Sequence, residues 1–543
     1  MSGAETPAPA PPAAPAPAPD TVPLPRMLAC IAASVLLWLT QGLGMNLIAV
    51  NTQQIQGALG ATLNESTWLV AAYMAPNVSL TILLTKVRTQ FGLRRFAEIS
   101  IAIFVAVSLL HLFVFDLHSA VVVRFFAGAA ASPMSTLAFL YMLDAFPPAR
   151  KMSWGLSMAL ACSSATPMVA RLLSPGLLDI GLWHGLYLLE VGLALVALCV
   201  VYLLPLTPVP RAKVLHWLDF ISYPLVALGF GLLAVVLALG RYYWWFEAPW
   251  IGACLAIAAL AIGLAAAIEL NRQTPLMNIQ WLTSPEIVHF TLILLAFRIV
   301  LAEQTAGAIG LFQTLGLMNE QSRLLYLAIL AATFLGGVVC ALLTRPERVN
   351  TLHAVALVFI AAGAWMDGHA TNLTRPGDMY LSQSLIAFGG ALFLPPALLV
   401  GLTKTMRQGP AYMTSFLLVF LFTQSIGGLM GSAFFGTFVT LREKFHSSQI
   451  VEHITLTNPV VAERVHQLSA AYGRVLTDGQ LLSAEGLALL AQQATREANI
   501  LAYNDAFLLI AALAVAALAF ILLHSGYGWW RARFSARHPA TAA

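Results

Sequence analysis

Four ionisable residues lie inside long apolar stretches of this chain, where they could bind protons or form buried ion pairs. Arg124 and Glu190 lie in two separate stretches, and Arg298 and Glu303 share a third. An ionisable group in such a setting is costly, so each is a functional-site hypothesis. We expect Glu190 and Glu303 either to carry a proton or to form a static ion pair. The arginines available for such a pair are Arg124, Arg171 and Arg298.

The spacing of these charges limits how they can pair. Positions five apart do not face each other on a helix, so Arg298 and Glu303 are expected to contact other helices rather than each other. Several further carboxylates stand at the ends of apolar stretches, where solvation is the simpler expectation. These are Asp144, Asp219, Glu269 and Asp505.

Fourteen apolar runs must position these groups. Each run is long enough to cross a bilayer as a helix, which takes about 20 residues. The chain is 59% hydrophobic and only 10% charged, as expected for repeated membrane spans. The sequence therefore predicts an all-α integral membrane protein. The spans lie near residues 27–50, 67–86, 96–116, 119–145, 152–174, 182–205, 217–240, 249–270, 286–310, 323–344, 351–371, 379–402, 412–440 and 501–524.

Basic residues are concentrated in one of the two sets of short connections. That set holds Lys86, Arg88, Arg94, Arg95, Arg150, Lys151, Arg211, Lys213, Arg272, Arg345, Arg348, Lys404 and Arg407, and the opposite set only Arg241, Arg323 and Arg375. Because cytoplasmic loops carry the excess of Lys and Arg, both termini are expected in the cytoplasm.

Composition argues against several other classes of protein. The net charge of +4 reflects the placement of basic residues beside the membrane and does not suggest nucleic-acid binding. The five cysteines lie in apolar segments without a pairing or zinc motif. No compact polar cluster suggests catalysis, so we expect neither an enzyme nor a cofactor or metal. A non-transporting scaffold is a further alternative.

Three polar segments flank or interrupt the spans. Residues 1–26 are rich in Ala and Pro and predict a disordered cytoplasmic tail. Residues 525–543 form a basic cytoplasmic tail. Residues 441–500 form a long external loop that is either a passive cap over the external opening or a docking surface for a periplasmic partner.

Helix signals occur within the external loop. Asn458–Pro459 predicts a helix start, because proline suits the first helical position. Ser483 is expected to cap a second short helix that runs through Arg496.

The residues around Arg124 resemble the fourth-span motif of the major facilitator superfamily. Arg124 is followed at the fourth position by Gly128, then by small residues and Pro133. Fourteen spans with a long loop before the last resemble the EmrB-like branch of drug:proton antiporters. Similar stretches occur in order at 67–68, 146–150, 272–276, 427–433 and 501–507.

The resemblance implies two six-helix bundles that rock about a site near the bilayer midplane. The bundles would span residues 27–208 and 281–524, with two inserted helices in 209–280. Residues implied to act in conformational change are Gly92, Arg94, Arg95, Gly128, Pro167, Gly427, Gly428 and Gly431.

The chain departs from the family pattern at several positions. Thr89 takes the acidic position of the loop between spans two and three, although Gly92 remains. Pro167 of the fifth-span motif is kept without its glycines. Gly44 aligns with a first-span aspartate that is typical of this branch. If that aspartate normally carries the proton, another group carries it here or the coupling differs.

Candidate substrate contacts are the polar and aromatic residues of the spans expected to line the site. Ordinary contacts between helices explain any one of them about equally well. They are Asn46, Asn51, Tyr73, Asn77, Phe297, Gln304, Phe422 and Gln424.

The resemblance implies a function in the bacterial inner membrane. We expect export of amphiphilic drugs or toxic compounds driven by inward proton flow. A periplasmic adaptor and an outer-membrane channel would be partners in a tripartite pump. The alternative is a secondary transporter of a specific metabolite or siderophore with different coupling, which the missing acid at Gly44 makes plausible.

Overall fold

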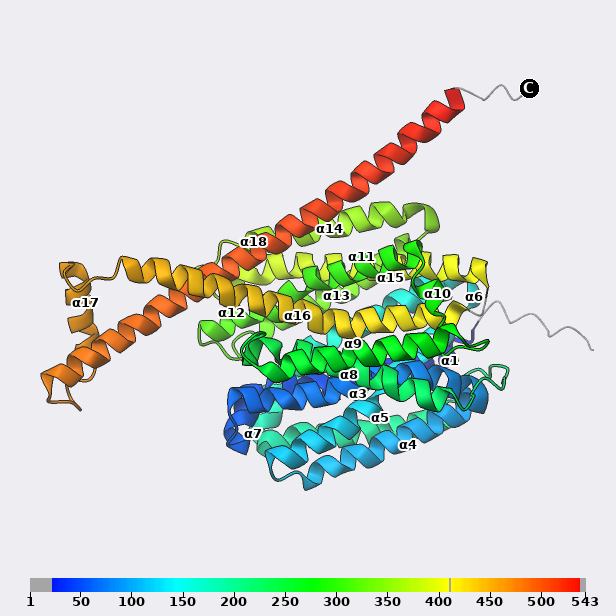
Figure 1. The fold of residues 1–543 in the computed structure, drawn as a ribbon, viewed down its shortest axis with the longest axis horizontal. Helices are drawn as coiled ribbons and strands as arrows, with labels where there is room; N and C mark the ends of the chain where they lie inside the picture. The colour runs from blue at the N-terminus through cyan, green and yellow to red at the C-terminus, as the bar shows by residue number, and fades with distance from the viewer. Residues whose placement is uncertain (1–21, 410–411, 538–543) are drawn as a thin grey trace, which may run out of the picture.

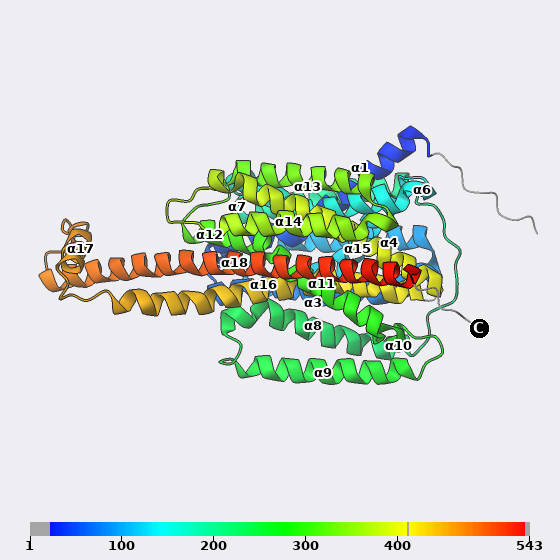
Figure 2. The same ribbon diagram turned by 90° about the horizontal axis from the view of Figure 1, so that it is seen from above.

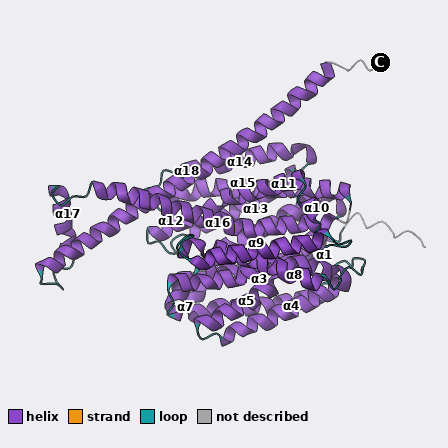
Figure 3. Ribbon diagram, viewed as in Figure 1, coloured by secondary structure: helices purple, strands orange, loops and turns teal. Residues whose placement is uncertain are grey.

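The computed structural model describes residues 22–409 and 412–537, and within them the regular structure is entirely helical (Figures 1 and 3). Fourteen helical segments of this part are long and apolar enough to cross a membrane. They coincide with the fourteen spans expected from the sequence. Residues 1–21 of the expected N-terminal tail lie outside the described residues, and the first helix begins at Leu24.

The N-terminal bundle contains the first six spans. Its helices are α1 (Leu24–Val50), α2 (Thr52–Leu59), α3 (Leu63–Phe91), α4 (Leu93–Leu110), η1 (His111–Phe113), α5 (Leu117–Asp144), α6 (Pro148–Arg150), η2 (Lys151–Gly155) and α7 (Leu156–Leu203). Two of the long helices have well-formed N-termini. The Thr62 hydroxyl accepts a hydrogen bond from the backbone N–H of Glu65 at the start of α3. Asp116 caps α5 in the same way, which satisfies backbone donors that would otherwise lack partners.

Helix α7 contains two spans that run in opposite directions. Its apolar segments are Pro148–Ile180, which begins in α6, and Trp183–Leu203. A Cβ atom added at Gly185 would clash with the carbonyl oxygen of Leu177. Residues eight positions apart in a straight helix lie about 12 Å apart, so the chain must reverse between them.

The last eight spans form the insert and the C-terminal bundle. The insert consists of α8 (Asp219–Tyr243) and α9 (Pro249–Leu270). The bundle and its connections contain α10 (Ile279–Leu282), α11 (Pro285–Ala302), η3 (Glu303–Gly307), α12 (Ala308–Thr314), α13 (Arg323–Leu343), η4 (Pro346–Arg348), α14 (Val349–Asp367), η5 (Pro376–Met379), α15 (Tyr380–Gln408), α16 (Met413–Glu452), α17 (Pro459–Ala470) and α18 (Gly479–Arg537). Helix α8 packs against α3 and α16, and α9 lies outside it (Figure 2).

The two bundles meet where α7 packs against α13 and α15 and where α3 packs against α16. Helices α7 and α13 approach each other closely at Gly337, because a Cβ atom added there would lie 2.9 Å from the Cβ atom of Ala161. The insert covers the other contact, where the Phe230 ring of α8 packs 5.0 Å from that of Phe422.

Helices α16 and α18 extend far beyond the other spans and carry α17 between them (Figures 1 and 2). At 1.5 Å per residue, the 40 residues of α16 and the 59 of α18 measure about 60 and 90 Å, against a hydrocarbon core of about 30 Å. We call the projecting part, residues 441–500, the hairpin, and the side of the bundle that bears it the hairpin end.

The hairpin differs in two ways from the sequence expectation. The start of α17 is as expected, with the Asn458 side chain accepting from the N–H of Val460. The second short helix is wrong, because Ser483 and Arg496 both lie inside the continuous α18. The hairpin also projects away from the bundle, which does not fit a cap folded over an opening (Figure 1). Residues 525–537 of the expected basic tail continue α18, and residues 538–543 lie outside the described residues.

Candidate functional site

Arg124 lies in the middle of α5 and is fully buried among three helices. Its Nη1 atom donates to the carbonyl oxygen of Gly44 in α1 at 2.7 Å, and its Nε atom to that of Leu69 in α3 at 3.3 Å. The guanidinium group lies 4.2 Å from the centre of the Tyr73 ring, a distance at which a cation and an aromatic face attract each other. The Nη2 atom has no hydrogen-bond partner among the described residues.

Gly128 brings α5 close enough to α3 for these contacts. A Cβ atom at this position would clash with the backbone carbonyl group of Tyr73. The Asn77 side chain donates to the carbonyl oxygen of Gly128 at 3.0 Å, which ties the same two helices together. The small residue one turn after Arg124 therefore has a direct structural role in seating that arginine.

Glu190 reaches the same point from the sixth span. Its carboxyl group is 3% exposed, and its Oε1 atom would lie 2.9 Å from a Cβ atom built on Gly44. Glu190 thus occupies the space that a side chain at position 44 would fill. Arg124 and Glu190 converge on Gly44 from opposite helices, but they do not form an ion pair within 4 Å. Glu190 Oε1 has no hydrogen-bond partner in the described part of the chain.

The C-terminal bundle holds a second buried group of polar side chains. Gln383 of α15 donates through Nε2 to Glu303 Oε1 and to Asp367 Oδ2, both at 2.7 Å. Glu303, Asp367 and Gln383 are 0%, 2% and 0% exposed. Gln304 holds α15 in place by donating to the carbonyl oxygen of Gln383 at 3.2 Å. Asp367, the last residue of α14, was not among the residues singled out from the sequence.

Arg298 faces α16 and not Glu303, as the spacing of the two residues predicts. Its Nη2 atom donates to the carbonyl oxygen of Gln424 at 2.7 Å. Added Cβ atoms at Gly427 and Gly428 would lie 2.9 and 3.2 Å from the Arg298 side chain. The glycines of the thirteenth span therefore leave room for the half-buried Arg298 side chain.

Most candidate substrate contacts bond within or between helices. Asn46 and Asn51 donate to carbonyl oxygens of their own helix, at 2.7 and 2.8 Å. Phe297 stacks on Phe393 at 3.7 Å inside the C-terminal bundle. Phe422, by contrast, lines a narrow pocket between the two bundles. The pocket is formed by Val78, Thr81, Ile82 and Thr85 of α3 and by Leu418, Leu421 and Phe422 of α16.

The residues implied to act in conformational change lie in different structural settings. Gly92 has a φ of 85°, which favours glycine, and it joins α3 to α4. Arg94 pairs with Glu98 at 2.8 Å on the surface, and Arg95 is exposed. Pro167 lies inside α7, next to the point where Thr166 packs against Gly42 of α1.

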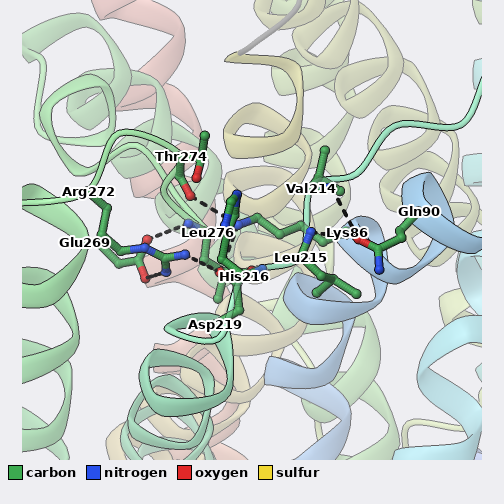
Figure 4. Close-up of polar contacts among 10 residues, drawn as sticks. All are labelled: Lys86, Gln90, Val214, Leu215, His216, Asp219, Glu269, Arg272, Thr274 and Leu276. Carbon is green, nitrogen blue, oxygen red and sulfur yellow. Dashed lines mark hydrogen bonds and ion pairs between the residues drawn. The ribbon is translucent and has the colours of Figure 1, made fainter.

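A buried ion network, drawn in Figure 4, lies where α3 ends and α8 begins, at the end of the bundle opposite the hairpin (Figure 1). Lys86 of α3 and Arg272 both donate to Asp219 Oδ1, at 2.8 and 2.7 Å. Arg272 also pairs with Glu269 at 2.7 Å. The expectation of solvated carboxylates at Asp219 and Glu269 is therefore wrong, since their side chains are fully buried in ion pairs.

The network joins the N-terminal bundle to the insert and to the segment that follows it. Lys86 donates to the carbonyl oxygen of Thr274 at 3.3 Å, and Gln90 accepts from the N–H of Leu215 at 2.9 Å (Figure 4). Burial lowers the pKa of Arg272, but its hydrogen bonds and charge interactions with Asp219 and Glu269 outweigh burial and raise that pKa. The guanidinium group therefore stays charged.

Comparison with known proteins identifies related sequences over most of the chain. Multidrug export protein EmrB of Haemophilus influenzae is 26% identical over 475 residues, which cover 84% of this chain and 88% of that protein. Fatty acid resistance protein FarB of Neisseria gonorrhoeae is 23% identical over 524 residues, covering 92% and 99%.

Solved structures share the fold at low sequence identity. The human organic anion transporter MFSD10 (TETRAN) matches with a TM-score of 0.54 and 12% identity, over 90% of this chain and 99% of that one. A peptide transporter, POT, matches with a TM-score of 0.52 and 14% identity, over 87% and 94%. The family model described as Major Facilitator Superfamily matches residues 33–432, so the chain is a multi-pass membrane protein that belongs to the major facilitator superfamily of secondary transporters and not to a family of enzymes.

Proposed function

We propose that this transporter exports amphiphilic drugs or toxic compounds across the bacterial inner membrane in exchange for protons. The observation that carries the proposal is the position of Glu190 beside Arg124 and Gly44. A carboxyl group without a hydrogen bond to Oε1, buried near a fixed guanidinium group, can bind and release a proton as its surroundings change. Glu303 is the corresponding candidate in the C-terminal bundle.

The position of Glu190 also bears on the alternative function. The loss of an acid at Gly44 makes a secondary transporter of a specific metabolite or siderophore, with different coupling, a plausible alternative. Because the Glu190 carboxyl group fills the space beside Gly44, an acid remains available at that place on another helix. We therefore favour proton exchange over different coupling.

The substrate class is supported by the pocket and by the related proteins. The pocket between α3 and α16 is lined mainly by apolar side chains, with two threonine hydroxyl groups. The cavity encloses only about 10 Å³ in this state, far less than the roughly 300–1,000 Å³ of a pocket for a drug-sized compound. Its lining therefore supports the proposal only through the apolar character that a compound would meet once the bundles move apart. The names of the relatives refer to multidrug export and to fatty acid resistance.

The hairpin is proposed to contact a periplasmic adaptor, which would connect the transporter to an outer-membrane channel. This places the hairpin end outside the inner membrane and both termini in the cytoplasm, in agreement with the distribution of Lys and Arg. Replacement of residues 453–478 by a short linker is expected to abolish crosslinking to the adaptor while membrane insertion is retained. Unchanged crosslinking would remove the docking role.

Flux in inverted membrane vesicles with an imposed proton gradient tests the main proposal. Amphiphilic compounds, including fatty acids, are expected to dissipate the gradient with the native protein. Glu190→Gln is expected to abolish this response at unchanged expression, and Glu303→Gln and Arg124→Ala are compared with it. Glu286→Gln, at an exposed carboxylate, is the matched control. Accumulation of compounds without proton movement would exclude proton exchange.

A further inference from the structure

The second polar group of the C-terminal bundle is a candidate ligand site in its own right. Glu303 and Asp367 come from the ninth and eleventh spans and meet at one amide group, that of Gln383. The two carboxyl groups lie side by side, because both accept a hydrogen bond from the same nitrogen atom, Gln383 Nε2, at 2.7 Å. We propose that Glu303, Asp367 and Gln383 form a second proton-binding site, separate from Glu190, which holds one exchangeable proton between the two carboxyl groups.

The charge of the pair requires a proton. Gln383 supplies one N–H to each carboxyl group, and an amide carries no net charge. No basic side chain in the described part of the chain lies within 4 Å of either carboxyl group. Two adjacent buried carboxylates with no cation beside them are strongly disfavoured, because each repels the other and both have lost their hydration. One bound proton halves the charge and supplies a donor to the pair.

Buried polar atoms without partners also indicate that the site binds a proton. Glu303 Oε2 and Gln383 Oε1 are buried acceptors without a hydrogen-bond donor in the described residues. Both residues are 0% exposed, and the Gln383 amide group lies against both carboxyl groups. A site with two acidic groups, one fixed donor and spare acceptors is suited to a proton.

Other charged groups around the pair are engaged elsewhere. The elements packed against η3, which contains Glu303, are α11, α12, α15, α16 and α18, and Asp367 of α14 meets Glu303 at the Gln383 amide group. Arg298 binds the carbonyl oxygen of Gln424, His353 lies against that of Phe393, Arg442 and His446 bind Asp505, and the Tyr503 hydroxyl lies against Gly310. Asp367 is therefore the titratable group that faces Glu303 most directly.

The local backbone gives the site a means of exchange. Glu303 opens η3, a π-helical turn between α11 and α12, and such turns are frequent at functional sites. Asp367 ends α14, and the side chain two positions later, His369, is exposed at the hairpin end. The pair therefore lies close along the chain to a segment that is exposed to water at that end.

Infrared spectroscopy of the purified full-length protein tests the site without requiring transport. The native protein is expected to show the signal of a protonated carboxyl group that disappears reversibly as the pH is raised. The double variant Glu303→Gln/Asp367→Asn keeps the side-chain volumes. Its spectrum is expected to lack the contribution of one protonated carboxyl group, the one that the pair shares. Glu190→Gln is expected to retain it, as is the control Asp378→Asn, at an exposed carboxylate.

Two results would overturn the proposal. One is an identical carboxyl signal in the native protein and the double variant at every pH. The other is loss of the signal on adding sodium at constant pH, which would make the pair a sodium site. The inference deepens the proposed function, which vesicle flux tests separately. If the native protein exchanges protons for substrate, the double variant is expected to move fewer protons per substrate. If the native protein moves no protons, the proposed function fails, and the infrared result still decides whether the pair binds a proton.

Discussion

At the scale of single residues, a carboxyl group has an unusual position beside a glycine. Glu190 Oε1 would lie 2.9 Å from a Cβ atom at Gly44, and Arg124 binds the Gly44 carbonyl oxygen. In this arrangement, proton coupling depends on the position of the carboxyl group and not on which helix carries it. The carboxyl group should therefore tolerate being moved from α7 to α1 by an exchange of residues.

The exchange variant is Gly44→Asp combined with Glu190→Ala. Glu190→Ala alone is expected to lose proton-coupled flux, and the double variant is expected to recover a measurable part of it in the vesicle assay. The alanine makes room for the aspartate, which then points at the space that Glu190 vacates. Gly44→Asn/Glu190→Ala is the neutral control of equal size. Equal flux in the two double variants would show that the charge at this place is not needed.

Gly128 allows a second prediction at this scale. Gly128→Ala is expected to lower the free energy of unfolding by about 1–3 kcal/mol, the usual result of forcing an extra group into a packed site. The added methyl group would meet the Tyr73 carbonyl group. Gly192→Ala is the control, because a Cβ atom there meets nothing within 4 Å. Thermal unfolding in detergent measures both, and equal stability of the two variants would contradict the close approach of α3 and α5.

At the scale of elements, the buried ion network connects α3 to the insert (Figure 4). The family pattern has an acidic residue in the loop after the second span, where this chain has Thr89. Here Asp219 at the start of α8 supplies the negative charge and binds Lys86 and Arg272. The insert thereby holds the end of α3, where position 89 carries no acidic residue that could do so.

Asp219→Asn is expected to destabilise the protein by about 3–5 kcal/mol, since it leaves two buried cations without a shared partner. The matched control is Glu286→Gln, whose ion pair with Lys404 is 3.6 Å long and has side chains 67% and 62% exposed. Exposed pairs of this kind contribute about 0–1 kcal/mol. Both values come from unfolding in detergent. A loss for Asp219→Asn as small as that of the control would mean that the network does not hold α8 against α3.

The elements could be predicted from sequence more completely than the sites. Apolar runs define spans because length and hydropathy are local properties, and ionisable residues inside such runs, such as Glu190, stand out for the same reason. Asp367 was missed because it ends a helix, where a carboxylate ordinarily meets water. Its burial depends on Gln383 and Glu303, which are distant in the chain. The burial of Asp219 likewise depends on partners in other helices.

At the scale of the whole molecule, one side chain at the hairpin end makes hydrogen bonds from the C-terminal bundle to two helices of the N-terminal bundle. Asn319 lies in the turn between α12 and α13 and accepts from Arg171 Nη1 at 3.0 Å. Its Nδ2 atom donates to the carbonyl oxygen of Val50 at 3.3 Å and to Ser174 Oγ at 3.4 Å. A residue of the C-terminal bundle thus holds both α1 and α7 of the N-terminal bundle. Rocking of the bundles must break these bonds to open this end.

Asn319→Ala is therefore expected to favour opening at the hairpin end. Loss of the partner of a buried donor costs about 1–3 kcal/mol, and a coupling of that size corresponds to a shift of about 5–150-fold in a conformational equilibrium. The reporter is Val50→Cys in a variant without the five native cysteines, since only the backbone of Val50 binds Asn319. A membrane-impermeant thiol reagent added on the hairpin side should label this cysteine several-fold faster when Asn319 is replaced.

The control for this prediction lies at the same end of the molecule but within one bundle. Asn372 donates to Glu497 at 2.7 Å, and both residues belong to the C-terminal half. Asn372→Ala removes an amide of the same kind without touching the contact between bundles, so labelling of Cys at position 50 should not change. If both substitutions accelerate labelling equally, the effect comes from loosening of the hairpin end in general. If neither does, Asn319 does not hold the bundles together, and the closure of this end depends instead on the apolar packing of α7 against α13.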